Sequence, residues 1–243
     1  LIGPALDRLQ GVDHRVIDVM PDWQGHYWFI TRNGLVGVSS RDGSQVEVTE
    51  LTGERIDNAL AIGEQGVFVV SSHAMYRFNR ASDGSPDINW REEYNRGSAP
   101  KPGTMGHGSG TTPTLVGNDF VAFTDNADGR INVVVLRQSP ASGESPFFCK
   151  IPVFKSDRGT SENSLTAIGD SLIVENNFGY QGPFENITAE PGLARADIGK
   201  GFNNHYGSIS IMPDGTAYIG TIHGVVKVRD SAAGESVTIR KPQ

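Results

Sequence analysis

The chain reads Val67-Phe68-Val69-Val70-Ser71, then a polar turn at Ser72-His73, then Met75-Tyr76-Arg77-Phe78. Both runs are rich in β-branched and aromatic residues, and residues that favour turns separate them. Runs of this kind predict two antiparallel strands joined as a hairpin. No window of the chain sustains a helical period over the roughly ten to twelve residues that a helix prediction needs. The sequence therefore predicts an all-β protein.

The same hairpin pattern recurs along the chain. Five runs can be aligned on one position, which is occupied by Trp28, Phe68, Val121, Leu172 and Tyr218. Successive aligned positions are 40, 53, 51 and 46 residues apart. Repetition at this scale indicates a repeat architecture in which each repeat is one supersecondary unit.

Further short strands are predicted on both sides of these hairpins. One precedes each hairpin, at residues 15–19, 58–62, 112–116, 164–168 and 208–212, and one follows four of them, at residues 46–51, 88–94, 147–154 and 236–240. Four antiparallel strands in about 40 to 50 residues are typical of a β-propeller blade. A β-sandwich has a similar strand density, but it has no reason to repeat at five nearly even intervals.

The predicted fold is a single β-propeller domain, residues 1–243, with about five visible blades. The fourth blade is predicted to be incomplete. Its third strand is expected near Leu193-Ala194-Arg195, and only residues 199–202 remain where an outermost strand would follow. Either this blade has three strands, or residues are missing and the molecule has six or more blades.

The balance of charged residues indicates which kinds of partner the chain can bind. The 243 residues include 21 Lys and Arg against 28 Asp and Glu, a formal charge of −7, without a basic run. This balance argues against nucleic acid as a partner. No apolar stretch approaches the roughly 20 residues that span a bilayer. The chain starts at Leu1, and we expect a processed or partial product whose export signal has been removed, located outside the cytoplasm as a secreted or periplasmic protein.

Four segments resemble a known group of proteins. Residues 108–115, 124–128, 161–165 and 213–220 are similar to a family of exported bacterial β-propeller proteins, described as quinoprotein-like or hypothetical. The similarity extends from about Asp22 to Asp230. Members of that family are longer and carry extra blade sequence where this chain has residues 199–202. The resemblance implies a propeller fold and a location outside the cytoplasm.

A functional site is expected at one mouth of the central channel, where the innermost strands begin. Polar residues from every blade are predicted to converge there: Arg15, Asp57, Thr111, Asn163 and Tyr206 in one ring, with His14, Asn58, Thr112, Glu162, Ser164 and His205 beside them. A ring of charged and hydrogen-bonding groups is a place where a small molecule can bind.

Within this ring, five residues are candidate metal ligands: Asp57, Asn58, Glu162, Asn163 and Asn204. Carboxylate and amide oxygens are the ligands that Ca²⁺ prefers. A metal there could polarise an ester or lactone oxygen, with His14 or His205 moving the proton. The arrangement is similar to the one-metal sites of gluconolactonase-like propellers. The sequence thus predicts a metal-dependent hydrolase of small esters or lactones.

Simpler interpretations remain open. The same side chains could merely satisfy backbone groups and waters along the channel. The chain could be a non-catalytic propeller that binds a protein or glycan partner, or a quinoprotein-like redox protein. The Gly-rich residues 105–110 are expected to form a lid near the channel, and the amide-rich Glu175-Asn176-Asn177 is expected to close a hairpin. Trp23, Trp28 and Trp90 are expected to pack between blades.

Overall fold

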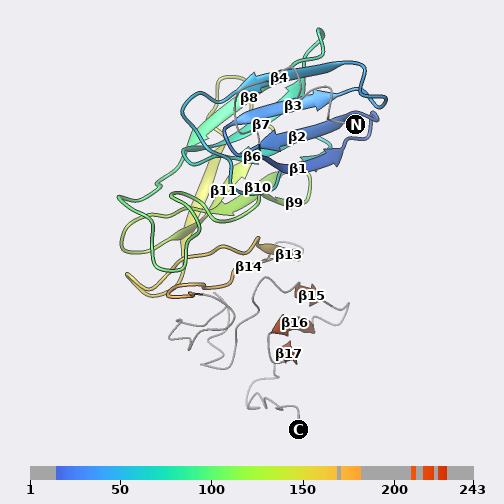
Figure 1. The fold of residues 1–243 in the computed structure, drawn as a ribbon. Helices are drawn as coiled ribbons and strands as arrows, with labels where there is room; N and C mark the ends of the chain where they lie inside the picture. Colours follow the sequence, from blue (N-terminus) through green and yellow to red (C-terminus); the bar gives the residue numbers. More distant parts are fainter. Residues whose placement is uncertain (1–14, 169–170, 182–208, 212–215, 222–223, 229–243) are drawn as a thin grey trace.

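The computed structural model describes residues 15–168, 171–181, 209–211, 216–221 and 224–228 (Figure 1). Within these residues the regular structure consists of β-strands. None of the described residues form a helix that is long and apolar enough to cross a membrane.

The first three sheets each contain four antiparallel strands that are neighbours in sequence order. Blade 1 consists of β1 (Val16–Pro21), β2 (Tyr27–Thr31), β3 (Leu35–Ser39) and β4 (Val46–Glu50). Blade 2 consists of β5 (Ala61–Gly63), β6 (Gly66–Val70), β7 (Ala74–Arg80) and β8 (Pro86–Glu93). Blade 3 consists of β9 (Thr114–Val116), β10 (Phe120–Thr124), β11 (Asn132–Arg137) and β12 (Phe147–Pro152).

The later sheets are described in part. In blade 4, β13 (Thr166–Ile168) pairs with β14 (Ser171–Ile173). In blade 5, β15 (Ile209–Ile211), β16 (Ala217–Thr221) and β17 (Gly224–Val228) form a three-stranded sheet. The strands predicted near residues 193–195 and at residues 236–240 lie outside the described residues.

Side chains alternate between two apolar cores along each central strand. In β6, Val67 and Val69 pack toward blade 1, whereas Phe68 and Val70 pack toward blade 3. In β10, Val121 and Phe123 join the core shared with blade 2, whereas Ala122 joins the core shared with blade 4. The period of two follows from strand geometry, since successive side chains point to opposite faces. Each of these two sheets is therefore buried on both faces by its neighbours.

This arrangement confirms the predicted fold, which is an all-β propeller built from consecutive antiparallel blades. The hairpin strands were predicted closely because their apolar runs are long and end at polar turns. The innermost strands are shorter than expected: β5 begins at Ala61 rather than at Asn58, and β9 begins at Thr114. The residues before them can therefore form the channel mouth.

Gly37 is required by the packing of one aromatic side chain. It lies opposite Phe29 in the pairing of β2 with β3, and the Phe29 ring is fully buried directly over it. A Cβ at position 37 would overlap that ring. Replacement by alanine therefore forces the ring out of its place.

We expect Gly37→Ala to lower the free energy of unfolding by about 1 to 3 kcal/mol, which is typical of an overpacked core. Urea denaturation of Gly37→Ala in the wild-type and Phe29→Leu backgrounds measures the effect. The loss should be much smaller in the Phe29→Leu background, because the smaller leucine side chain can move aside. An equal loss in both backgrounds would show that the ring is not the cause.

Candidate functional site

Two carboxylates from different blades occupy equivalent positions. Asp57 lies four residues before β5 begins at Ala61, and Glu162 lies four residues before β13 begins at Thr166. In blade 3, between them, the same offset before β9 is occupied by Gly110. The innermost strands β5, β9 and β13 are neighbours in that order. The repeat therefore places Asp57 and Glu162 on one rim with a glycine between them.

The glycine-rich segment 103–110 runs across both carboxylates. A Cβ at Gly106 would lie 2.9 Å from Asp57 Oδ2, and a Cβ at Gly110 would lie 2.5 Å from Glu162 Oε1. Side chains at either position would collide with the carboxylates, so the backbone can approach them only because these residues are glycine. The lid expected from the sequence is thus a close-fitting cover over Asp57 and Glu162.

Several hydrogen bonds hold this cover in place. Ser109 N donates to Tyr94 Oη at 2.8 Å, and Gly179 N of blade 4 donates at 3.0 Å to the carbonyl oxygen of Pro102, the residue directly before the cover. Arg96 Nη2 lies 3.2 Å from His107 Nδ1. The arginine is the donor in this contact, because a guanidinium group cannot accept a hydrogen bond. His107 Nε2 is 3.0 Å from Gly97 O. The cover is therefore fixed to blades 2 and 4 and to the residues that lead into it.

Glu162 lies in an environment that favours its protonated form. Burial raises the pKa of Glu162 to about 7, and the nearby charge of Asp57 adds to this increase. A hydrogen bond from the backbone N–H of Met105, in the cover, acts in the opposite direction. The backbone of Glu162 is fixed by Asn177, whose Oδ1 accepts a hydrogen bond from Glu162 N at 2.8 Å. At neutral pH this carboxyl group is available both as an acid and as a base.

Asp57 is held by two arginines. Arg55 Nη2 donates to both of its oxygens, at 2.8 and 3.1 Å, and Arg32 Nε lies 3.1 Å from Oδ1. The side chains of Arg55 and Arg32 are 51% and 41% exposed. Ion pairs that are this exposed contribute little to stability. Their main effect is to place two guanidinium groups at the mouth beside the carboxylates.

Two predicted amides lie at the same rim. Asn58 Nδ2 donates to Ser109 O at 2.9 Å and so contacts the cover. Asn163 Nδ2 donates to the buried Glu175 Oε2. The structure thus brings Asp57, Asn58 and Glu162 together around residues 105–110, and Asn163 follows Glu162 directly.

The other predicted ring members have different outcomes. His14, Asn204, His205 and Tyr206 lie outside the described residues. Thr111 is fully buried, and its hydroxyl accepts a hydrogen bond from Thr124 N at 2.9 Å, which is a structural role. By offset, the counterpart of Asp57 is Glu162 rather than Asn163.

Sequence reasoning missed the roles of Arg32, Arg55 and Asn177. Arg55 stands two residues before Asp57, which was a usable signal, whereas Arg32 comes from the β2–β3 turn of the preceding blade.

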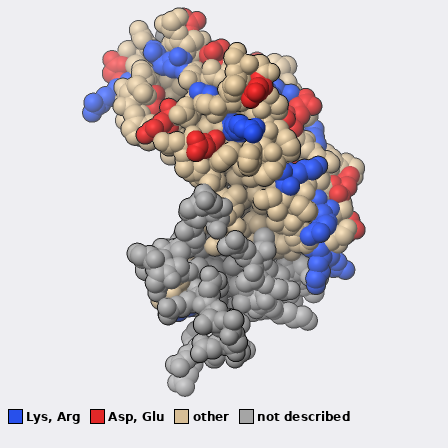
Figure 2. All heavy atoms as spheres, turned by 180° about the vertical axis from the view of Figure 1, so that it is seen from behind, with Lys and Arg blue, Asp and Glu red and all other residues tan. Residues whose placement is uncertain are grey.

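Among the described residues, no three His, Cys, Asp or Glu side chains are grouped so that they could hold a metal ion. Across the face in Figure 2, acidic and basic side chains of the described part are interspersed.

Comparisons with known proteins give two similarities. No family model matches the chain. A protein of Archaeoglobus fulgidus, described as uncharacterised, is 30% identical over 182 residues, which cover 67% of this chain and 35% of that protein. The chain therefore spans about a third of the length of this relative. The crystal structure of BamB from Moraxella catarrhalis has 16% identity and a TM-score of 0.39, with 86% of this chain and 83% of that chain covered. Neither description names a gluconolactonase or a quinoprotein, and those resemblances stay predictions.

The raised pKa of Glu162 makes a prediction for stability. Between pH 4.5, the ordinary value, and about 7, the folded chain binds more protons at Glu162 than the unfolded chain does. Stability from this group is therefore greatest at low pH and decreases as the pH rises through 7. Glu162→Gln removes the charge that burial disfavours. The change in the free energy of unfolding that this substitution causes should therefore be more favourable at pH 8 than at pH 5, by about 1 to 3 kcal/mol.

Urea denaturation at the two pH values measures this difference. Glu47→Gln, at an exposed position of β4, controls for the loss of a carboxylate. If Glu162→Gln has the same effect on stability at pH 5 and pH 8, Glu162 does not have the raised pKa.

Proposed function

We propose that this propeller is a hydrolase of small esters or lactones, with its reaction centre at Asp57 and Glu162. One observation carries the proposal: two carboxylates from separate blades converge beneath a fixed cover, and the pKa of Glu162 is raised to about 7. Buried polar groups with perturbed pKa values are enriched at active sites. A carboxyl group that only forms structural ion pairs is charged at neutral pH, whereas Glu162, with a pKa of about 7, is about half protonated there.

Glu162 supplies proton transfer in this mechanism. A general base is most effective when its pKa lies near the working pH, because the required protonation state is then populated. Deprotonated Glu162 accepts a proton from the attacking water, and the same group then donates it to the leaving alkoxide. Arg32 and Arg55 present guanidinium N–H groups at the mouth, where they can bind the substrate carbonyl oxygen as negative charge develops on it.

A divalent cation fits the donor set only in part. Asp57 and Glu162 repel one another, and Ca²⁺ would relieve that repulsion with further oxygens from Asn58 and Asn163. Asp57 already shares its charge with two arginines, which weakens its attraction for a cation. When bound, Ca²⁺ would polarise the ester carbonyl. Asn204 stays a proposed ligand, and His14 and His205 stay proposed proton carriers; all three are outside the described residues.

A second candidate function is a non-catalytic propeller that binds a protein partner. It is favoured by the outermost strand of blade 3, β12, where Phe147, Phe148 and Ile151 are 42%, 48% and 51% exposed. Apolar side chains gathered on a surface strand are typical of an interaction site. The quinoprotein-like redox role remains a prediction from the resemblance, and the location outside the cytoplasm remains a prediction from the sequence.

Hydrolysis of p-nitrophenyl acetate and of γ- and δ-lactones tests the first candidate, in buffer with Ca²⁺ and with a chelator. We expect measurable turnover that falls by about 100-fold or more in Glu162→Gln, because general acid–base catalysis contributes about that much. Glu47→Gln should keep full activity. Chelation should lower the rate and the melting temperature if Ca²⁺ takes part.

Turnover that is absent with every substrate, or that is unchanged in Glu162→Gln, would reject the hydrolase. The partner-binding candidate would then be the better account. Turnover that falls in Glu162→Gln but is unchanged by the chelator would show that no Ca²⁺ takes part. The mechanism based on Glu162 would then still hold.

A further inference from the structure

The turn between β1 and β2 is built around one carboxylate. Asp22 Oδ1 accepts hydrogen bonds from Gln24 N at 2.9 Å and His26 N at 2.8 Å. Asp22 Oδ2 accepts one from Trp28 Nε1 at 3.0 Å and lies 3.2 Å from His26 Nδ1. Backbone bonds between Asp22 and His26 and between Gly25 and Asp22 close the turn. The conformation of residues 22–26 is therefore strongly determined.

This turn holds Trp23 out in solvent. Trp23 is 69% exposed, whereas Trp28 is 2% exposed in the core between blades 1 and 2. Trp90 is partly buried, with its ring 6.0 Å from that of Phe68 and its Nε1 bonded to Gln138 O. Trp28 and Trp90 thus pack as the sequence predicted, and Trp23 does not. Because Trp23 remains mostly in solvent, its indole contributes little burial to folding, and a large aromatic surface on a rigid turn is left available for binding.

Trp23 stands at a pocket of about 480 Å³ between blades 1 and 2. Ligand pockets typically measure roughly 300 to 1,000 Å³. The floor is formed by the buried Trp28, Val67 and Phe78, and polar walls are formed by residues that include Gln24, Glu64 and Arg80. The pocket therefore offers an aromatic face, an apolar floor, and both hydrogen-bond donors and hydrogen-bond acceptors.

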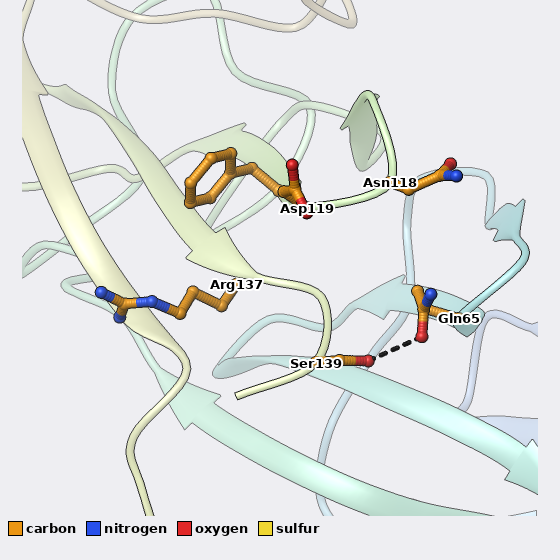
Figure 3. Close-up of a pocket in the computed structure, with 6 residues that line it drawn as sticks. Gln65, Asn118, Asp119, Arg137 and Ser139 are labelled. Atoms are coloured by element: carbon orange, nitrogen blue, oxygen red, sulfur yellow. Dashed lines mark hydrogen bonds between the residues drawn. The ribbon is translucent and has the colours of Figure 1, made fainter. Parts of the chain in front are cut away.

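The corresponding junction between blades 2 and 3 provides an internal comparison. Its pocket measures about 270 Å³ and is lined by Gln65, Asn118, Asp119, Phe120, Arg137 and Ser139. Figure 3 shows Ser139 bonded to Gln65, at 2.8 Å, with the Arg137 guanidinium directed away from both. This pocket is smaller, and no tryptophan lines it. The longer turn of blade 1 is what distinguishes the first junction.

The Trp23 pocket and the carboxylate pair lie on opposite faces of the propeller. Asp57 precedes the innermost strand β5, whereas the turns that line the pocket follow the ends of β1 and β5. Because the innermost strands run in the same sense through the blades, these two ends lie on opposite faces of the propeller. The pocket is therefore separate from the proposed reaction centre.

We propose that the Trp23 pocket binds a neutral saccharide unit of an oligosaccharide or glycan. The apolar C–H face of a pyranose ring would stack on the exposed indole, and its hydroxyls would bond to Gln24, Glu64 and Arg80 at the walls. Hydroxyls both donate and accept, so they suit walls that contain a carboxylate, an amide and a guanidinium. Small-molecule sites combine a few polar groups with an apolar surface in the same manner.

The contacts that the pocket's carboxylates already make favour a neutral ligand over a cation. Asp22 is saturated by its contacts with Gln24, His26 and Trp28, and Glu64 accepts a hydrogen bond from Asn118 Nδ2 at 3.1 Å. Arg80 lines the same pocket and opposes a second positive charge. An aromatic cage for a quaternary ammonium would also need more than one exposed ring.

Intrinsic fluorescence with acrylamide quenching tests the proposal, because Trp23 is the exposed one of the three tryptophans. The probes are maltotriose, cellotriose, chitotriose and mannotriose, with tetramethylammonium and adenosine as competing chemistries. At least one trisaccharide should protect the fluorescence from quenching. Calorimetry should show affinity at least tenfold weaker in Trp23→Ala and intermediate in Trp23→Phe.

Two control variants separate this site from others. Ile151→Ala, at an exposed position of β12, should bind the trisaccharide as the wild type does, and so should Glu162→Gln. Binding of no trisaccharide, equal affinity in Trp23→Ala, or protection by tetramethylammonium or adenosine alone would overturn the proposal. Loss of binding in Glu162→Gln would overturn the assignment to a separate pocket.

Discussion

The structure depends on the burial of both faces of its central blades. A strand such as β6 directs Val67 and Val69 to one side and Phe68 and Val70 to the other. Blade 2 therefore has two apolar faces, and it can bury neither of them without a neighbouring blade. Burial of apolar surface contributes about 25 cal/mol per Å², and such a sheet obtains it only by packing between two others. The face-to-face packing of consecutive blades follows from this requirement.

The carboxylate pair is a consequence of that alignment. Because blades 2 to 4 are packed in register, equivalent positions before β5, β9 and β13 meet on one rim. Aspartate, glycine and glutamate occupy them in turn. The glycine leaves space for Glu162, and the segment that leads to it covers both acids. The pKa of Glu162 is raised mainly because the cover and its neighbours remove water from it.

The sequence was sufficient to predict the fold and part of the site. A continuous run of β-branched and aromatic residues that ends at a polar turn, such as residues 67–71, is a local signal, so strands and blades could be predicted. The sequence could place Asp57 and Glu162 on a shared rim, but it could not fix their register, because the predicted inner strand began three residues too early in blade 2 and two too early in blades 3 and 4. Arg32 reaches Asp57 from another blade, and Trp23 is exposed because Asp22 organises its turn. The Arg32 contact joins two blades, and no local pattern encodes it. The contacts of Asp22 lie within residues 22–28, but the residue types of that turn do not reveal that Trp23 is left in solvent.

The central claim is that Asp57 and Glu162, from two blades, form one electrostatically coupled site. A ¹³C NMR titration of side-chain carboxyl groups, with Glu162 assigned through Glu162→Gln, tests it in wild type and in Asp57→Asn. The account predicts a pKa of about 7 for Glu162 in the wild type and a lower value once the charge at position 57 is removed. A wild-type value near the ordinary 4.5, or one that does not change in Asp57→Asn, would contradict it.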